Sequence, residues 1–299
     1  MPAVRSDIKG IVVPLLIPYS ENGDIALDVL KQEIDYVITR DKAHAVVAGG
    51  TSIQEVPLLT PSERKLIIEA TVEYVKGRVP VLAGISDNTL SGALGYAKIA
   101  QDAGADVLVA MPPFSAPPGP PTRDEIFAYY QSLSEKVELP ILAYNPATVI
   151  VDMPLDLLKK IAELKMVRYI KETSRNMNKL TRLIVSLKDK VGIFTTMDVL
   201  LPTLQLGAIG AVIPSPASKL GVQIYEAFIK GDLSKAAELQ SKFAIFPPDL
   251  GKGFTPIFKE AMNLLGIKVG RPRAPFLGLS DAEREIVKQS LKASGIMCT

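Results

Sequence analysis

The sequence predicts an α/β fold: a (β/α)₈ TIM barrel followed by a C-terminal helical extension. Short apolar runs alternate with longer amphipathic stretches eight times over residues 10–231, and parallel strands need crossover helices of this kind. The length of 299 residues suits one closed barrel of about 250 residues plus an extension. We therefore assign residues 1–231 to the barrel and residues 232–299 to a helical appendage packed on it.

The expected strands are short runs dominated by apolar residues. They are 10–18, 43–50, 79–85, 105–113, 139–145, 167–171, 191–196 and 208–215. An open, doubly wound sheet is the alternative arrangement for such an alternation. That fold is disfavoured because no G-x-G-x-x-G motif follows the first strand, so its dinucleotide-binding signature is missing.

The expected helices follow the strands and carry apolar residues at helical spacing. The clearest start is at Thr60, where Pro61 takes the first helical position and Glu63 completes a capping box. The barrel helices are expected at 26–39, 62–75, 89–104, 123–137, 155–164, 176–188, 198–207 and 218–231. Further helical patterns in the extension cover 233–246, 253–266 and 281–294.

Composition excludes several classes of function. Lys and Arg number 34 against 32 Asp and Glu, so no global field favours nucleic acid or a membrane surface. The first residues lack the apolar core of a signal peptide, and no apolar run approaches a membrane span. The only cysteine, Cys298, has no partner for a disulfide, and the chain has no Cys/His metal framework. We expect a soluble, cytoplasmic protein that binds no metal.

The sixth strand ends on a lysine, Lys171. An ammonium that points into a barrel must leave water, which lowers its pKa and makes the neutral amine available. A neutral amine is the nucleophile that forms a Schiff base with a ketone. The alternative is a lysine whose head returns to solvent.

Tyr144 closes the fifth strand, as Lys171 closes the sixth. Neighbouring strands lie roughly 4.8 Å apart, so a phenol and an amine on adjacent strand ends reach one bound molecule. The phenol is then a candidate proton shuttle, and a core tyrosine is the alternative.

Thr51 and Ser52 follow a Gly-Gly pair at the end of the second strand. They are candidate hydroxyls for binding a ligand, and the alternative is that they are turn residues.

Six segments together resemble one family. GIVVPLLIPYSENGDI, AGGTSIQEVPLLTPSER, LPILAYNP, IKETS, GAIGAVIP and KEAMNLLG are similar, in this order and spacing, to motifs of the dihydrodipicolinate synthase / N-acetylneuraminate lyase superfamily of class I aldolases. The segments are residues 10–25, 48–64, 139–146, 170–174, 207–214 and 259–266.

The resemblance implies a barrel enzyme, commonly a homo-oligomer (dimer or tetramer), whose partner is a small-molecule 2-oxo acid. It implies an imine between Lys171 and pyruvate or another 2-oxo acid, with Tyr144 as the proton shuttle. No metal or organic cofactor is implied. By matched position, the residues that bind substrate are Gly50, Thr51, Ser52 and Val212, the last through its backbone carbonyl near the imine.

The chain departs from the family pattern at four places. The usual T-G-E is Ser52-Ile53-Gln54-Glu55, in a longer loop without the glycine. The loop after Tyr144-Asn145 lacks the arginine that dihydrodipicolinate synthases place there for a substrate carboxylate. Phe114 stands where a tyrosine is common, which removes one relay hydroxyl. Arg175-Asn176 replaces Gly-Asp, so Arg175 is either a cation that binds a substrate carboxylate or a solvated residue at a helix start.

These departures favour a Schiff-base lyase that cleaves, condenses or dehydrates an acyclic 2-keto-3-deoxy-type acid. Dihydrodipicolinate synthase proper, acting on pyruvate and aspartate semialdehyde, is the first alternative. A non-catalytic barrel that binds a 2-oxo acid is the alternative from another class. A phosphate-binding barrel ranks lower, because Pro214 and Pro216 remove two backbone donors from the loop concerned. His44 is expected to be structural, and Glu55 and Glu172 to be solvated or supporting.

Overall fold

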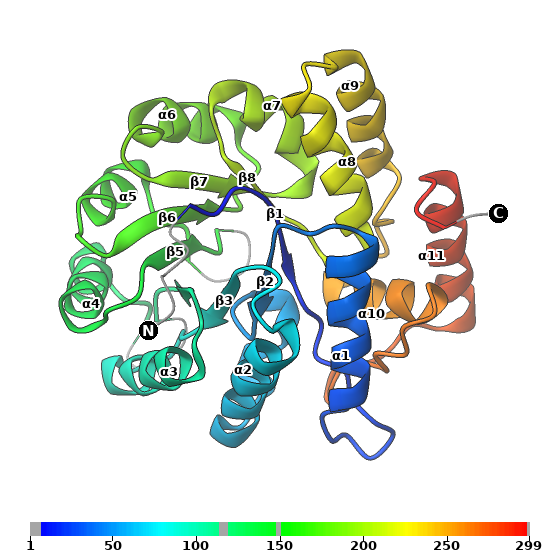
Figure 1. The fold of residues 1–299 in the computed structure, drawn as a ribbon, viewed down its shortest axis with the longest axis horizontal. Helices are drawn as coiled ribbons and strands as arrows, with labels where there is room; N and C mark the ends of the chain where they lie inside the picture. The colour runs from blue at the N-terminus through cyan, green and yellow to red at the C-terminus, as the bar shows by residue number, and fades with distance from the viewer. Residues whose placement is uncertain (1–6, 114–118, 148–150, 298–299) are drawn as a thin grey trace.

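The eight strands close into one parallel barrel in chain order, with β1 paired to both β2 and β8 (Figure 1). This computed structural model describes residues 7–113, 119–147 and 151–297, and the predicted (β/α)₈ barrel is confirmed. Phe114 and Cys298, named above, lie outside the described residues. The strands are β1 (Gly10–Pro14), β2 (Ala45–Ala48), β3 (Val81–Gly84), β4 (Val107–Ala110), β5 (Ile141–Asn145), β6 (Val167–Glu172), β7 (Gly192–Thr195) and β8 (Gly210–Val212).

Helices surround the barrel and follow its strands one by one (Figure 1). The capping box predicted at Thr60 is present: the Glu63 amide donates to Thr60 Oγ1 at 3.2 Å, and the Thr60 amide donates to Glu63 Oε2 at 2.8 Å. The barrel helices are α1 (Leu27–Asp35, continued by the π-helical turn Tyr36–Arg40), α2 (Pro61–Val75), α3 (Leu90–Ala103), α4 (Arg123–Lys136), α5 (Leu155–Ile161), α6 (Met177–Leu187), α7 (Leu200–Leu206) and α8 (Ser218–Ile229).

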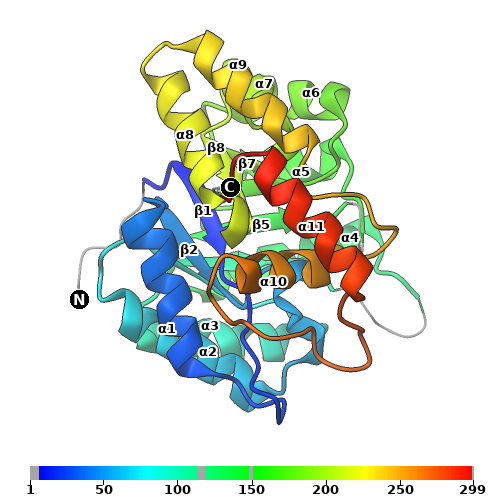
Figure 2. The same cartoon turned by 90° about the vertical axis from the view of Figure 1, so that its right-hand side faces the viewer.

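The C-terminal extension adds three helices, α9 (Leu233–Ser241), α10 (Phe254–Leu264) and α11 (Asp281–Ala293). Figure 2 shows α10 and α11 together on one side of the barrel, and α9 beside α8. Helix α10 packs against the 3₁₀ turns Ser52–Gln54 and Ser215–Ala217, which follow β2 and β8. The extension therefore contacts the carboxyl end of the barrel, where the βα loops gather.

Alternation along the strands decides which side chains fill the barrel. On β6, Tyr169 belongs to the inner apolar cluster, whereas Ile170 belongs to the outer cluster packed against the helices. Since side chains alternate between the two faces, Lys171 points inward, one layer above Tyr169. Tyr144 lies in the same inner cluster, above Leu142 on β5. Among the described residues, no helix has the length and apolarity needed to cross a membrane.

We predict that Gly84→Ala destabilises the protein by about 1–3 kcal/mol, because an added methyl has no room in the core. A Cβ at Gly84 would lie 1.9 Å from the Gly49 carbonyl oxygen. Gly95→Ala is the matched control, because its Cβ would meet no atom within 4 Å and alanine favours a helix by up to about 1 kcal/mol. Urea unfolding of both variants is the measurement, and equal effects would contradict this account.

Candidate active site

A cavity of about 110 Å³ opens at the carboxyl end of the barrel. It brings together six of the residues singled out from the sequence: Thr51, Ser52, Tyr144, Lys171, Arg175 and Val212. Gly50 is not part of the lining. A Cβ at Gly50 would lie 2.7 Å from Val47 Cγ1 and 3.2 Å from the Gly84 Cα, so the glycine serves close packing beneath the cavity.

The Lys171 amine is desolvated, and residues 7–113, 119–147 and 151–297 place no counter-charge beside it. The residue is 5% exposed, and its Nζ lies 3.9 Å from the centroid of the Tyr144 ring. Among the described residues, no hydrogen-bond or ion-pair partner meets this nitrogen. Burial therefore lowers the pKa of Lys171 from 10.5 to about 7. A large fraction of the amine is neutral near pH 7, which is the form that attacks a carbonyl carbon.

The Tyr144 side chain lies against this amine and carries a phenol that can hold a proton. Tyr144 and Lys171 are paired neighbours in the β5–β6 register, as their matching strand ends predict. The Tyr144 hydroxyl lies 3.3 Å from Ser52 Oγ, and burial raises the pKa of Tyr144 above its ordinary value of 10.0. The phenol stays protonated near neutral pH, and it forms a hydrogen-bonded pair of hydroxyls with Ser52.

Gln54 shapes the loop in which the sequence departs from the family pattern. Its side chain is fully buried. Gln54 Oε1 accepts hydrogen bonds from the Thr51 amide at 3.0 Å and from Thr51 Oγ1 at 3.2 Å. Its Nε2 donates to the carbonyls of Leu15 and Val47. The Thr51 hydroxyl is therefore engaged with Gln54, which leaves Ser52 as the hydroxyl that contacts the phenol.

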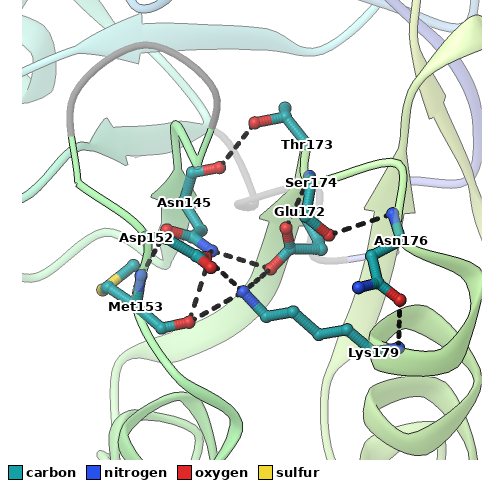
Figure 3. A network of polar contacts seen from close by, with 8 residues as sticks. All are labelled: Asn145, Asp152, Met153, Glu172, Thr173, Ser174, Asn176 and Lys179. Atoms are coloured by element: carbon teal, nitrogen blue, oxygen red, sulfur yellow. Dashed lines mark hydrogen bonds and ion pairs between the residues drawn. The ribbon is translucent and has the colours of Figure 1, made fainter.

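Glu172, which follows Lys171 in the chain, is buried and belongs to a polar network that reaches the surface at Asp152 (Figure 3). The Asn145 amide donates to Glu172 at 2.8 Å, and Lys179 of α6 lies 3.2 Å from the same carboxylate and also pairs with Asp152. Thr173 Oγ1 donates to the Asn145 carbonyl at 2.8 Å. The network joins the ends of β5 and β6, which carry Tyr144 and Lys171. Of the two roles expected for Glu172, the supporting one is present.

A second buried ion pair ties the extension to the site. Lys259 of α10 is 1% exposed, and its Nζ lies 2.8 Å from Glu55 Oε2. Burial lowers the pKa of Lys259, and the nearby Glu55 partly opposes that shift. Glu55 Oε1 also accepts the Arg273 amide at 2.7 Å. Glu55, three residues after Ser52, is therefore buried and supporting.

His44 is structural as expected, because its Nδ1 accepts a hydrogen bond from the Ile11 amide at 3.1 Å.

Several residues of the cavity were not found from the sequence: Thr196, Asp198, Phe254 and Phe258. A signal existed for Thr196 and Asp198, because they directly follow the seventh strand. Nothing local identified Phe254 and Phe258, which reach the cavity from α10. In the part of the chain that the structure describes, no group of three or more His, Cys, Asp or Glu residues could hold a metal ion.

The fold and this cavity define a class of protein. It is a (β/α)₈ barrel whose mouth contains a desolvated lysine beside a phenol, an arrangement suited to imine chemistry with a small carbonyl compound. Comparison with known proteins agrees with this class. Residues 7–294 match the model of the dihydrodipicolinate synthetase family. The chain belongs to that family.

Individual relatives are similar over almost their whole length. The 4-hydroxy-tetrahydrodipicolinate synthase of Caldicellulosiruptor saccharolyticus is 30% identical over 96% of this chain and 97% of its own. A dihydrodipicolinate synthase from Acinetobacter baumannii, solved with pyruvate, has a TM-score of 0.90 at 25% identity, covering 97% of this chain and 100% of that one. CdNal from Clostridium difficile, solved with mannosamine, has a TM-score of 0.86 at 26% identity, covering 95% and 98%.

We predict that Lys171→Met changes how stability depends on pH. The unfolded chain binds the Lys171 proton up to pH 10.5, whereas the folded chain releases it above about 7. Between these two pKa values the unfolded chain binds one more proton than the folded chain, so lowering the pH favours unfolding. The free energy of unfolding of the natural protein should rise, relative to the variant, by about 1.4 kcal/mol per pH unit. Urea titrations at pH 7, 8 and 9 measure the slope, and parallel curves would contradict the lowered pKa.

Proposed function

We propose that the protein is a Schiff-base-forming lyase that acts on pyruvate or a related 2-oxo acid by aldol cleavage, condensation or dehydration. The observation that carries this proposal is the buried amine of Lys171, which lies over the ring of Tyr144 and has no ion-pair partner in the described part of the chain. An amine without a counter-charge in an apolar barrel costs folding free energy. This cost is explained if the neutral form of the Lys171 amine is the nucleophile of a reaction.

In the proposed reaction, the Lys171 nitrogen attacks C2 of the 2-oxo acid. The carbonyl oxygen takes up protons and leaves as water, and an imine remains. In the cleavage direction the C3–C4 bond breaks, its electron pair moves into the protonated imine to give an enamine, and the C4 hydroxyl releases its proton to form an aldehyde. In dehydration C3 loses a proton and the C4 hydroxyl leaves as water. The imine serves as the electron sink, so the proposal needs no cofactor or metal.

The hydroxyl relay carries the protons of these steps. Tyr144 lies against the amine and Ser52 lies 3.3 Å from its phenol, so we assign the relay to this pair. Thr51 and Ser52 are proposed to hold the substrate carboxylate, and the Val212 carbonyl to face the imine. The engaged hydroxyl of Thr51 favours Ser52 as the relay residue.

Relatives support a pyruvate-type substrate without identifying the second one. The names of two of them refer to dihydrodipicolinate synthases, one solved with pyruvate, and a third was solved with mannosamine. Dihydrodipicolinate synthase activity proper is the narrower alternative, and a non-catalytic 2-oxo-acid-binding barrel is the alternative from another class. The homo-oligomer, the absence of nucleic-acid partners and the cytoplasmic location stay predictions.

Borohydride trapping tests the chemistry directly. Incubation with pyruvate followed by reduction should add one pyruvate-sized group to the peptide that contains Lys171, and Lys171→Ala should abolish the addition. Lys259 is an internal control, because it is also buried but ion-paired with Glu55. Absence of an adduct with pyruvate and with a panel of 2-oxo acids, on folded protein, would leave the binding barrel as the better account.

Exchange of solvent deuterium into the methyl group of pyruvate tests the relay without knowledge of the second substrate. The exchange requires imine and enamine formation, so it reports proton transfer at C3. We expect Tyr144→Phe to slow it by about 10²-fold or more, and Ser52→Ala to slow it more than Thr51→Val does. Proton NMR of the pyruvate methyl signal measures the rate. Equal rates in Tyr144→Phe and the natural protein would remove Tyr144 from the relay.

A further inference from the structure

Arg175 has a backbone conformation that its residue type disfavours. It lies between β6 and α6 with a φ of 56°, in the left-handed region that glycine occupies without penalty. A side chain with a Cβ is strained there, because the Cβ lies too close to the following carbonyl oxygen. Backbone strain of this kind, in a loop beside a cavity, suggests that the Arg175 side chain has a function there.

The side chain extends along the wall of the cavity that contains Lys171. Its Nε lies 3.0 Å from Asp198 Oδ2, and its Cζ lies 5.3 Å from the centroid of the Phe254 ring. The Arg175 side chain is still 46% exposed. Among the described residues, the guanidinium has no second ion pair, and no hydrogen bond from its two terminal nitrogens, Nη1 and Nη2, is present. The guanidinium is thus oriented by Asp198 and Phe254 while its outer edge remains available.

Ionisable groups are few in this lining. Among the described lining residues, Lys171 and Arg175 are the cations and Asp198 is the acid, apart from the Tyr144 phenol. Lys171 is consumed by the imine in the proposed reaction. Arg175 is therefore the cation that remains for the end of the substrate farthest from the imine, and the paired Nη edge of a guanidinium matches a carboxylate in a bidentate contact.

We propose that Arg175 binds a second carboxylate at the far end of the substrate, so that the preferred substrates are 2-oxo acids with a distal carboxylate. This inference rests on the proposed function and narrows its substrate class. The first carboxylate, next to C2, is held at Thr51 and Ser52, and the second is held at Arg175, beside Asp198 and Phe254 in the same lining. The competing assignment is a hydroxylated chain that donates to Asp198.

Matched 2-oxo acids of equal chain length separate these assignments. The first pair is 2-oxoglutarate and 2-oxovalerate, which differ in a terminal carboxylate against a methyl group, and 5-hydroxy-2-oxovalerate supplies the hydroxyl. The second pair is 2-oxoadipate and 2-oxohexanoate. The concentration that gives half-maximal borohydride trapping should be at least about tenfold lower for each carboxylate-ended acid, since a charged hydrogen bond contributes more than 1.4 kcal/mol. Tighter capture of the hydroxyl-ended acid would overturn the inference.

Variants then assign the preference to Arg175. Glycine accepts a φ of 56° without strain, so Arg175→Gly should fold, and its preference for carboxylate-ended acids should fall to about onefold. Arg175→Lys, a point charge without a fork, should keep an intermediate ratio. Arg182→Ala is the matched control, because it removes one exposed cation from the outer helix α6 and should leave the ratio unchanged. A ratio that persists in Arg175→Gly would overturn the inference.

Calorimetric titration with the same acids measures binding whether or not an imine forms. It therefore distinguishes failure of the lyase proposal from failure of the Arg175 inference. An Arg175-dependent ratio in binding without any trapped adduct would retain this inference and reject the lyase. Adducts that form with pyruvate but show no Arg175-dependent ratio would retain the lyase and reject this inference. Loss of both the adduct and the ratio would reject both.

Discussion

Desolvation of one amine is the constraint on which the site depends. Alternation along β6 turns Lys171 into the barrel and Glu172 to the opposite face, where Asn145 and Lys179 hold its carboxylate. Had the acid faced inward, its charge would have favoured the ammonium and raised the pKa of the lysine. The period of a strand thus separates two adjacent charged residues and leaves the amine with a pKa of about 7.

The polar networks around the cavity position its side chains more than they stabilise the fold. A buried ion pair loses hydration on both partners, and the attraction between them roughly offsets that loss. Glu55 and Lys259 nevertheless join the extension to the loop that carries Ser52, while Gln54 fixes the backbone of the same loop. The extension is therefore part of the site, because its Phe254 and Phe258 complete the wall of the cavity.

Local sequence patterns predicted those features of the structure that depend on side-chain alternation and on the order of the strands. The eight strand–helix units, the capping box at Thr60 and the neighbouring positions of Tyr144 and Lys171 all follow from the period of the chain and from the order of the strands. The roles of Gln54 and Phe254 depend on contacts between distant segments, and no spacing rule encodes those contacts. Asp198 lies between these cases, because it follows a strand end but its pairing with Arg175 requires the closed barrel.

The same absence of counter-charge has a consequence for the proposed reaction. Imine formation at Lys171 followed by protonation creates a cation in a place where the protein supplies no anion within contact among its described residues. The carboxylate adjacent to C2 of a 2-oxo acid brings that anion with it. A simple ketone of the same size lacks it and would leave the iminium unpaired in a low-dielectric site, which is costly. If the proposed imine forms at Lys171, the desolvation that frees the amine would therefore also favour substrates that carry their own counter-ion.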